Sequence, residues 1–266
     1  SVLQNHFLKG VSYPTGGSSE IAFHMIPTIT KAGGNVFVRA PVDGIVLDNS
    51  GKAVGVRMKK DGRVINAPVI ISNAGLYNTV QLLPEPARPK LDYMMQHVRP
   101  GNGGMSVYVG LKGTAEELGL AGKHYWAMWT QPGKEDLDLI TENYMDRNVN
   151  DVTSGPVPLL FISFPSAKDP LWADKHPGKS TATIVTFANF DWFKKYENER
   201  VMHRGTEYEK LKKSLGELIW NQTLALFPQL KDKVEYFDVG TPVTNKYYIG
   251  AAGGEMYGVD HDVKRY

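Results

Sequence analysis

Two short groups of charged and hydroxyl residues in this 266-residue chain have side chains that could bind a phosphate or a metal ion. Gly178-Lys179-Ser180 resembles the end of a phosphate-binding loop, but Ala173 stands where the leading glycine of such a loop belongs, so we interpret it as a surface turn. Asp260-His261-Asp262 could hold a metal ion, yet no second histidine lies nearby at helical spacing, which favours a solvated turn. Zero cysteines exclude disulfides, thiolate metal sites and cysteine nucleophiles.

Three segments of small residues stand out from the rest of the chain. They are Pro14-Thr15-Gly16-Gly17-Ser18-Ser19, then Asn73-Ala74-Gly75 after the apolar run 69–71, then Gly250-Ala251-Ala252-Gly253-Gly254. Any of these segments is compatible with a tight turn in an ordinary α/β protein.

The elements that must position these segments begin with a helix and several short strands. Ile21, Ala22, Met25, Ile26 and Ile29 recur at helical spacing, Pro27 kinks the helix and Gly33-Gly34 ends it. Extended runs are expected at 35–38, 45–47 and 53–58, with a hairpin turn at Asp61-Gly62. The continuous apolar run 69–71 is typical of a strand buried on both faces.

The middle of the chain predicts a second domain of antiparallel sheet and helices. Four strands rich in Val, Ile and aromatic residues are expected at 105–111, 125–130, 159–164 and 181–187. Helices are expected at 90–97, 135–144 and 207–227, the last with a capping box of Thr206 and Glu209 and an end at Pro228. Most aromatic residues here should be core, and the remainder could wall a pocket for a long apolar substrate.

The composition of the chain limits the classes of partner that we expect it to bind. Hydrophobic residues make up 42% of the chain, which is enough for a substantial core, and a net charge of +2 does not favour nucleic acid as a partner. No apolar run reaches the length of a membrane span, and the first ten residues lack the apolar centre of a signal peptide. The chain begins without methionine, so we expect a piece of a longer protein that is soluble as it stands.

The order and spacing of the three small-residue segments resemble the phytoene-desaturase-like flavoprotein oxidoreductases. Three further segments are similar in sequence to the retinol-saturating members of that family. They are Ser18-Ser19-Glu20-Ile21-Ala22-Phe23-His24, Pro165-Ser166-Ala167-Lys168-Asp169-Pro170 and Tyr257-Gly258-Val259-Asp260-His261-Asp262. The likeness covers essentially the whole chain. It implies an α/β fold: a partial FAD/NAD(P)-binding Rossmann-type domain with an inserted mixed or antiparallel sheet-plus-helix substrate domain, which is α+β.

The resemblance also implies domain limits and site residues. Residues 1–78 would be the partial FAD-binding domain, 79–246 the substrate-binding domain, and 247–266 the start of the return to the FAD-binding domain. Val42 matches the position where family members contact the adenine through the backbone. Asn73, Ala74 and Gly75 match the loop that approaches the dinucleotide. No metal is implied.

The activity that the resemblance implies is FAD-dependent reduction of the 13,14 double bond of all-trans-retinol or a related polyene, with NAD(P) as an electron source. Family members associate with the endoplasmic reticulum membrane, which implies peripheral membrane contact. However, the Gly-x-Gly-x-x-Gly fingerprint that receives the pyrophosphate is absent from the sequence, so FAD binding by this chain alone should be weak or absent. A retinoid- or carotenoid-binding module without redox function, and a carotenoid isomerase-like flavoprotein, are the competing hypotheses.

The proton that alkene reduction requires has no assigned donor. Tyr248, Tyr257 and His261 are the candidates, since all lie in or near the glycine-rich segment close to the C-terminal end. Each is equally compatible with packing or a surface position, and the oligomeric state stays open.

Overall fold

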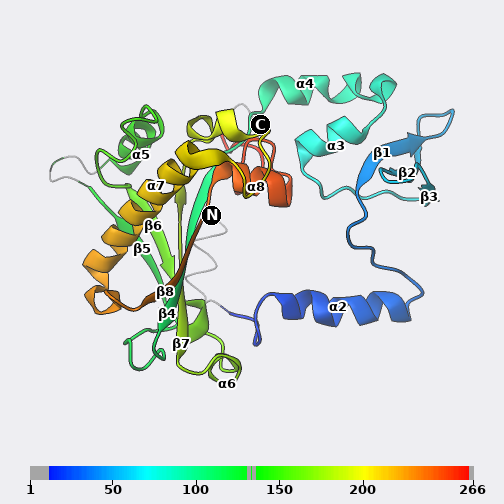
Figure 1. The fold of residues 1–266 in the computed structure, drawn as a ribbon. Helices are drawn as coiled ribbons and strands as arrows, with labels where there is room; N and C mark the ends of the chain where they lie inside the picture. The colour runs from blue at the N-terminus through cyan, green and yellow to red at the C-terminus, as the bar shows by residue number, and fades with distance from the viewer. Residues whose placement is uncertain (1–11, 131–132, 134–135, 264–266) are drawn as a thin grey trace.

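The fold contains two antiparallel sheets, as a computed structural model describes it for residues 12–130, 133 and 136–263. The smaller sheet has the order β1-β2-β3, formed by Val42–Leu47, Ala53–Met58 and Val64–Asn66. The larger has the order β5-β6-β7-β4-β8 and lies on the opposite side of the molecule (Figure 1). Its strands are His124–Met128, Leu159–Ser163, Lys179–Phe187, Gly104–Lys112 and Val234–Gly240, in that spatial order. This mixed α/β architecture confirms the predicted fold class.

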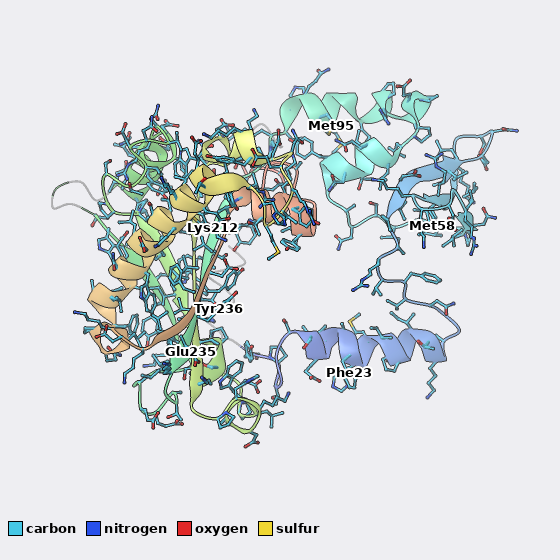
Figure 2. The ribbon with its side chains drawn as sticks, in the orientation of Figure 1. Phe23, Met58, Met95, Lys212, Glu235 and Tyr236 are labelled. Carbon is cyan, nitrogen blue, oxygen red and sulfur yellow. The ribbon has the colours of Figure 1, made fainter. Side chains whose placement is uncertain are left out.

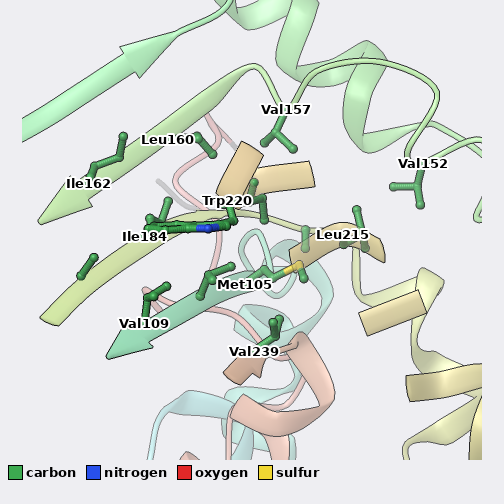
Figure 3. Close-up of a cluster of buried hydrophobic side chains, with 14 of the residues drawn as sticks. Met105, Val109, Val152, Val157, Leu160, Ile162, Ile184, Leu215, Trp220 and Val239 are labelled. Carbon is green, nitrogen blue, oxygen red and sulfur yellow. The ribbon is translucent and has the colours of Figure 1, made fainter. Parts of the chain in front are cut away.

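The five-stranded sheet buries one face beneath α7 (Gly205–Leu226) and leaves the other largely open. Its two long central strands, β4 and β7, pair from Gly104↔Phe187 to Lys112↔Lys179, so alternate residues of both point to the same face. Figure 3 shows Met105, Val109 and Ile184 of this buried face with Leu215 and Trp220 of α7. Each such fully buried side chain contributes roughly 1.5–3 kcal/mol to folding. The core of the molecule therefore lies between this sheet and α7.

The opposite face of the sheet, which we call the open sheet face, carries the intervening side chains. The register places His124 opposite Ser163 and Trp126 opposite Phe161, on the side away from the core. Side chains of this face are half-exposed or exposed: Tyr108, His124, Trp126, Met128, Leu159, Phe161, Val185 and Tyr236. An exposed face this rich in aromatic and aliphatic groups is typical of a ligand or interaction surface.

Shorter helices connect and flank the sheets. α3 (Leu76–Leu82) and α4 (Pro89–His97) link the small sheet to β4. Along the chain, α5 (Leu137–Met145) connects β5 to β6, and α6 (Trp172–Lys175) connects β6 to β7. α8 (Pro242–Ile249) follows β8 directly. Its first residue is a proline, and Thr241 caps it in a reciprocal capping box with Thr244. Figure 1 shows α8 and the segment after it beside α3.

The N-terminal helix α2 (Ser19–Lys31) makes little contact with the rest of the described chain. It has no buried residue, and its apolar side chains stay exposed: Ile21, Phe23, Met25, Ile26 and Ile29. Figure 2 shows Phe23 projecting from the helix without meeting another element. The predicted helix is confirmed, with Pro27 inside it, but its apolar face is unpartnered.

Three local predictions were wrong. Residues 35–38 form no strand, and Arg39 beyond them has φ of +54°. The run 69–71 is not a buried strand, since Val69 is 70% and Ile71 is 88% exposed; no described strand lies beside it to share its backbone hydrogen bonds. Thr206 does not cap α7, because the helix begins one residue earlier, at Gly205.

The other predicted elements are confirmed within a few residues at each end, including β2, α4, the four strands of the middle block and the end of α7 before Pro228. The predicted helix at 135–144 corresponds to α5, while residue 135 lies outside the described residues. Four helices and strands were missed: α3, α6, β8 and α8. In the part of the chain that the structure describes, no helix combines the length and apolarity needed to cross a bilayer.

Candidate functional site

The loop before α3 and the segment after α8 meet to form a cavity of about 370 Å³. Its lining comes from residues 73–78 on one side and from parts of 249–259 on the other. Asn78 joins the two sides, because its side-chain amide donates to the carbonyl oxygen of Ala74 at 2.8 Å and to that of Gly250 at 2.7 Å. Two segments that are far apart in sequence thus form one wall, which we call the small-residue cavity.

Gly75 shows why small residues are needed in this wall. Its φ of +85° and ψ of +159° lie in a region that is essentially restricted to glycine. A Cβ added there would meet no atom within 4 Å, so the backbone of Gly75 faces open space. A ligand can therefore approach the main chain directly at this point.

The second side of the cavity is held in place by β4 and the residues before it. Gly103 forms a β-bridge with Glu255 and Pro100 forms one with Val259, while the amide of Gly104 donates to the carbonyl oxygen of Gly254 at 3.1 Å. Glu255 is buried, and its carboxylate accepts from the backbone amides of Ala252 and Gly253 at 3.2 and 2.6 Å. These bonds fix the shape of the segment that follows α8.

The charge of the cavity indicates which part of a ligand it suits. Tyr77 lines the cavity and donates to the carbonyl oxygen of Val98 at 3.1 Å, and burial together with the nearby Glu255 carboxylate raises the pKa of its phenol. Among the described lining residues there is no lysine or arginine. A phosphate group would find no cation here and would be repelled by Glu255, so the cavity fits an uncharged ring rather than a pyrophosphate.

The predicted cofactor residues are distributed unevenly. Asn73, Ala74 and Gly75 all line the cavity, whereas Val42 does not. Val42 begins β1 opposite Met58, and β1 contacts α3, whose first residues line the cavity. The structure thus brings together residues 73–75 and 250–258, while Gly33-Gly34 stands at the far end of α2.

The three candidate proton donors lie outside the cavity. Tyr248 is 64% and Tyr257 is 68% exposed, and His261 is exposed as well. Arg99 forms ion pairs with Asp260 at 2.7 Å and with Asp262 at 3.5 Å, so both carboxylates of this motif face an arginine. Nothing in this geometry singles out one of the three as an acid.

A group of polar side chains at one end of the open sheet face was not predicted from the sequence. Lys168 donates to the hydroxyl of Ser163 at 2.6 Å and also contacts Nε2 of His124. Burial lowers the pKa of its ammonium group. We call His124, Ser163 and Lys168 the polar cluster. The register of β5 and β6 brings His124 beside Ser163, so spacing in the sequence could not have revealed the cluster.

The loop before α2 lies over this polar cluster. The backbone amide of Gly16 donates to the Asp169 carboxylate at 3.0 Å, and this bond holds the pKa of Asp169 below its ordinary range. The ring of Tyr13 faces the Lys168 ammonium, 5.9 Å from the ring centroid. The motif 165–170 therefore links the large sheet to the N-terminal part of the described chain.

Comparison with known proteins gives close relatives over the whole chain. The chain is 42% identical over 274 residues to the all-trans-retinol 13,14-reductase of Danio rerio and 44% identical over 270 residues to that of Macaca fascicularis, in both cases covering all of this chain. A protein of Danio rerio named inactive all-trans-retinol 13,14-reductase is 35% identical over 271 residues. No protein-family model matches. The chain spans 44% and 43% of the length of the first two relatives, less than half of each.

Solved structures support the fold. A crystal structure of an oxidoreductase from Methanosarcina mazei superposes with a TM-score of 0.52 at 19% identity, over 86% of this chain and 43% of that one. At this level of identity the likeness concerns the fold alone. The resemblance that the sequence motifs indicated is confirmed by the sequence relatives.

Proposed function

Because this chain is homologous over its whole length to the all-trans-retinol 13,14-reductases, we propose that it is part of an FAD-dependent oxidoreductase that reduces the 13,14 double bond of all-trans-retinol or a related polyene. The observation that carries this proposal is the small-residue cavity, in which residues 73–75 and 250–258 form one wall. In the whole protein this wall would hold the cofactor next to the open sheet face.

The cofactor assignment is limited to what the described residues fit. Bound FAD would supply the hydride for the reaction. We assign Asn73, Ala74 and Gly75, and also Val42, to cofactor contact; the first three would approach the flavin or adenosine part through the backbone. Since the chain lacks a Gly-x-Gly-x-x-Gly fingerprint, we assign the pyrophosphate to another part of the whole protein. NAD(P) is our proposal for the electron source.

The division of labour within the chain follows the two sheets. We propose that 1–78 belongs to the FAD-binding domain, 79–246 to the substrate domain and 247–266 to the return. The hydrogen bond from Asn78 to Gly250 supports this scheme, because it joins the first unit to the return. The open sheet face, with Trp126 and Phe161, would be the wall against which the substrate lies.

Unpartnered apolar surface supports a larger protein around this chain. α2 exposes a complete apolar face, and Val69 and Ile71 are exposed although their sequence is typical of a buried strand. Apolar side chains exposed in this number cost free energy unless another surface covers them, at roughly 25 cal/mol per Å². We propose that the remaining half of a protein as long as its relatives covers both, and that this protein associates peripherally with the endoplasmic reticulum membrane.

The experiment compares the whole protein with two variants at glycines of positive φ. Gly75→Ala places a methyl group on the open side of the cavity wall, whereas Gly119→Ala does so at a distant turn where φ is +63° and no atom lies within 4 Å. Both strain the backbone, but only the first narrows the cavity. We expect flavin absorbance and 13,14-dihydroretinol formation in the unaltered protein and in Gly119→Ala, and loss of both in Gly75→Ala.

The alternative, an apolar-ligand module without redox function, has a separate outcome in the same experiment. It predicts that the unaltered whole protein binds retinol without any flavin absorbance. That result would replace the proposed reductase, as would a flavoprotein that converts a carotenoid and leaves retinol unchanged. The inactive relative at 35% identity makes this control necessary.

A further inference from the structure

One row of side chains crosses the open sheet face at right angles to its strands. Ser106 of β4 stands directly opposite Val185 of β7. Val185 in turn stands opposite Phe161 of β6, and Phe161 stands opposite Trp126 of β5. Adjacent strands lie about 4.8 Å apart, so this cross-strand row spans roughly 14 Å from Ser106 to Trp126. A hydroxyl at the β4 end is thus followed by three largely apolar side chains.

The β4 end of the cross-strand row adjoins the small-residue cavity. Gly104 precedes Ser106 by two residues, so both face the open side of the sheet, about 6.7 Å apart along β4. A Cβ at Gly104 would overlap the side chain of Met256 and would lie 3.3 Å from the amide nitrogen of Asn245. Met256 also lines the cavity. Its side chain therefore connects the proposed cofactor wall with the position next to Ser106.

The Ser106 hydroxyl is open to a ligand. The residue is half-buried, and its hydroxyl forms no hydrogen bond to another residue in the part of the chain that the structure describes. Its neighbour on the other side of β4 is Gly240 of β8, which has no side chain that could cover it. A serine hydroxyl both donates and accepts, so it suits an alcohol group that does the same.

The chemistry of the proposed reaction decides which end of the substrate lies near the cavity. In a retinoid alcohol the 13,14 double bond adjoins the carbon that bears the hydroxyl. A cofactor held on the small-residue cavity therefore requires the hydroxyl to lie close to the cavity, with the rest of the chain and the ring extending away from it. The cross-strand row has the same order, because its hydroxyl is at the end next to the cavity and its aromatic rings are at the other.

We propose that Ser106 binds the terminal hydroxyl of the polyene alcohol, and that the conjugated chain crosses the strands over Val185 and Phe161. The ring of the substrate would then lie near Trp126, which is 42% exposed on the edge strand β5. This inference rests on the proposed function, since it concerns the substrate of that same site. Ser106 is here a specificity-determining residue, and no transfer of a proton or hydride is assigned to it.

A role for Ser106 as a small residue only is the competing explanation. In that case a larger side chain would block the approach to Gly104, but the hydroxyl itself would be unimportant. Alanine would then replace serine without effect on any ligand. The two explanations differ in whether loss of the hydroxyl weakens binding of an alcohol and leaves binding of the corresponding hydrocarbon unchanged.

The test measures binding of two ligands to the whole protein, as it is purified, by quenching of tryptophan fluorescence. The ligands are all-trans-retinol and its hydrocarbon analogue, in which a hydrogen replaces the hydroxyl. Ser106→Ala removes the hydroxyl of the row, and Phe161→Ala removes apolar surface from its middle. Thr183→Val is the matched control, because it removes a hydroxyl from the same sheet face one row farther from the cavity, opposite Tyr108. Thermal unfolding establishes that each variant is folded.

We expect Ser106→Ala to weaken retinol binding about three- to tenfold, in keeping with the loss of one hydrogen bond between uncharged groups. Its affinity for the hydrocarbon should be unchanged, and Thr183→Val should bind both ligands as the unaltered protein does. Phe161→Ala should weaken binding of both ligands by the same factor. Ser106→Gly lacks the same hydroxyl and gives the answer if Ser106→Ala does not fold.

Three results would refute the subsite. They are unchanged retinol binding in Ser106→Ala, an equal loss for both ligands in that variant, and the same selective loss in Thr183→Val. Unchanged binding of both ligands in Phe161→Ala would refute the placement of the conjugated chain along the row.

The outcome separates this proposal from the proposed function. A protein whose retinol binding depends on the Ser106 hydroxyl, but which reduces no retinoid, would retain the subsite and overturn the reductase. A protein that reduces retinol, while its Ser106→Ala variant binds retinol as tightly as before, would retain the reductase and overturn the subsite.

Discussion

Replacement of Gly254 by alanine is the sharpest test of how the segment after α8 is packed. Gly254 has φ of +67°, and a Cβ at this position would stand 2.4 Å from the carbonyl oxygen and 2.6 Å from the Cβ of Pro242. Both contacts are shorter than van der Waals distance, and the first is to backbone that cannot swing away. Gly254 also accepts hydrogen bonds from Gly104 and Asn245, so the clash would be transmitted to β4.

Two costs add for this substitution. The left-handed conformation of an alanine costs about 1–2 kcal/mol. The overlap with Pro242 costs about 1–3 kcal/mol more, as overpacking in a well-packed region usually does. Gly119→Ala is the matched control, because Gly119 has φ of +63° but no atom within 4 Å of the added Cβ. It should carry only the first cost.

The assay is thermal unfolding of the two variants beside the unaltered protein. For a domain of this size a change of 1 kcal/mol shifts Tm by about 2–4 °C, so Gly254→Ala should unfold about 2–12 °C below Gly119→Ala. Denaturant unfolding with an unchanged m-value would support the same interpretation. Equal unfolding temperatures of the two variants would refute the described contact between the segment after α8 and Pro242.

Three further results are expected. Asn78→Ala should cost about 1–3 kcal/mol in local stability, because it removes two hydrogen bonds. Faster amide hydrogen exchange at 249–254 would reveal this loss. Unchanged exchange would contradict the link between the two sides of the cavity. The Gly16–Asp169 bond lowers the pKa of Asp169 in the folded state. Its contribution to stability is therefore present above pH 3.8, the ordinary pKa, and is lost as the pH falls through the lowered pKa. Protease cleavage at 12–17 should therefore increase at acid pH, and also at neutral pH in Asp169→Ala. Cleavage that changes in neither case would contradict the role of the Gly16–Asp169 bond in holding this loop. Thr241→Ala should destabilise the protein by about 0.5–2 kcal/mol, since it removes the cap of α8, and a loss no larger than in the exposed-surface control Thr153→Ala would contradict this.

The elements that the sequence predicted well are those whose burial follows from their own residues. β4 and β7 alternate between buried and half-exposed positions, which gives a period that the residue types reproduce. β8 was missed because it is an edge strand with exposed polar and aromatic residues such as Glu235 and Tyr236. Its place in the sheet is decided by β4, which a local pattern does not contain.

The failure at 69–71 has a different cause. Three β-branched residues in a row predict burial, and in an isolated reading they also predict a strand. A strand needs a neighbour for its backbone groups, and none of the described strands supplies one. The same reasoning applies to α2, where the periodicity was correct but no described element covers the apolar face.

The candidate site was half accessible to sequence reasoning. Asn73, Ala74 and Gly75 were found through the family resemblance, and their small size agrees with a close backbone approach; all three line the cavity. Glu255 and Tyr77 were missed, since a buried carboxylate and a phenol carry no signal of their own until the segments meet. The polar cluster depends on the pairing of His124 with Ser163, and a shift of one residue in that register would turn the two side chains apart.

The most direct test of the flavin assignment is amide hydrogen exchange of the whole protein with and without FAD. If the small-residue cavity is a wall of the cofactor site, FAD should slow exchange at residues 73–78 and 249–259 together, and leave the exposed turn at Gly119 unchanged. Protection that appears elsewhere in the protein, with no change in these two segments, would contradict the account.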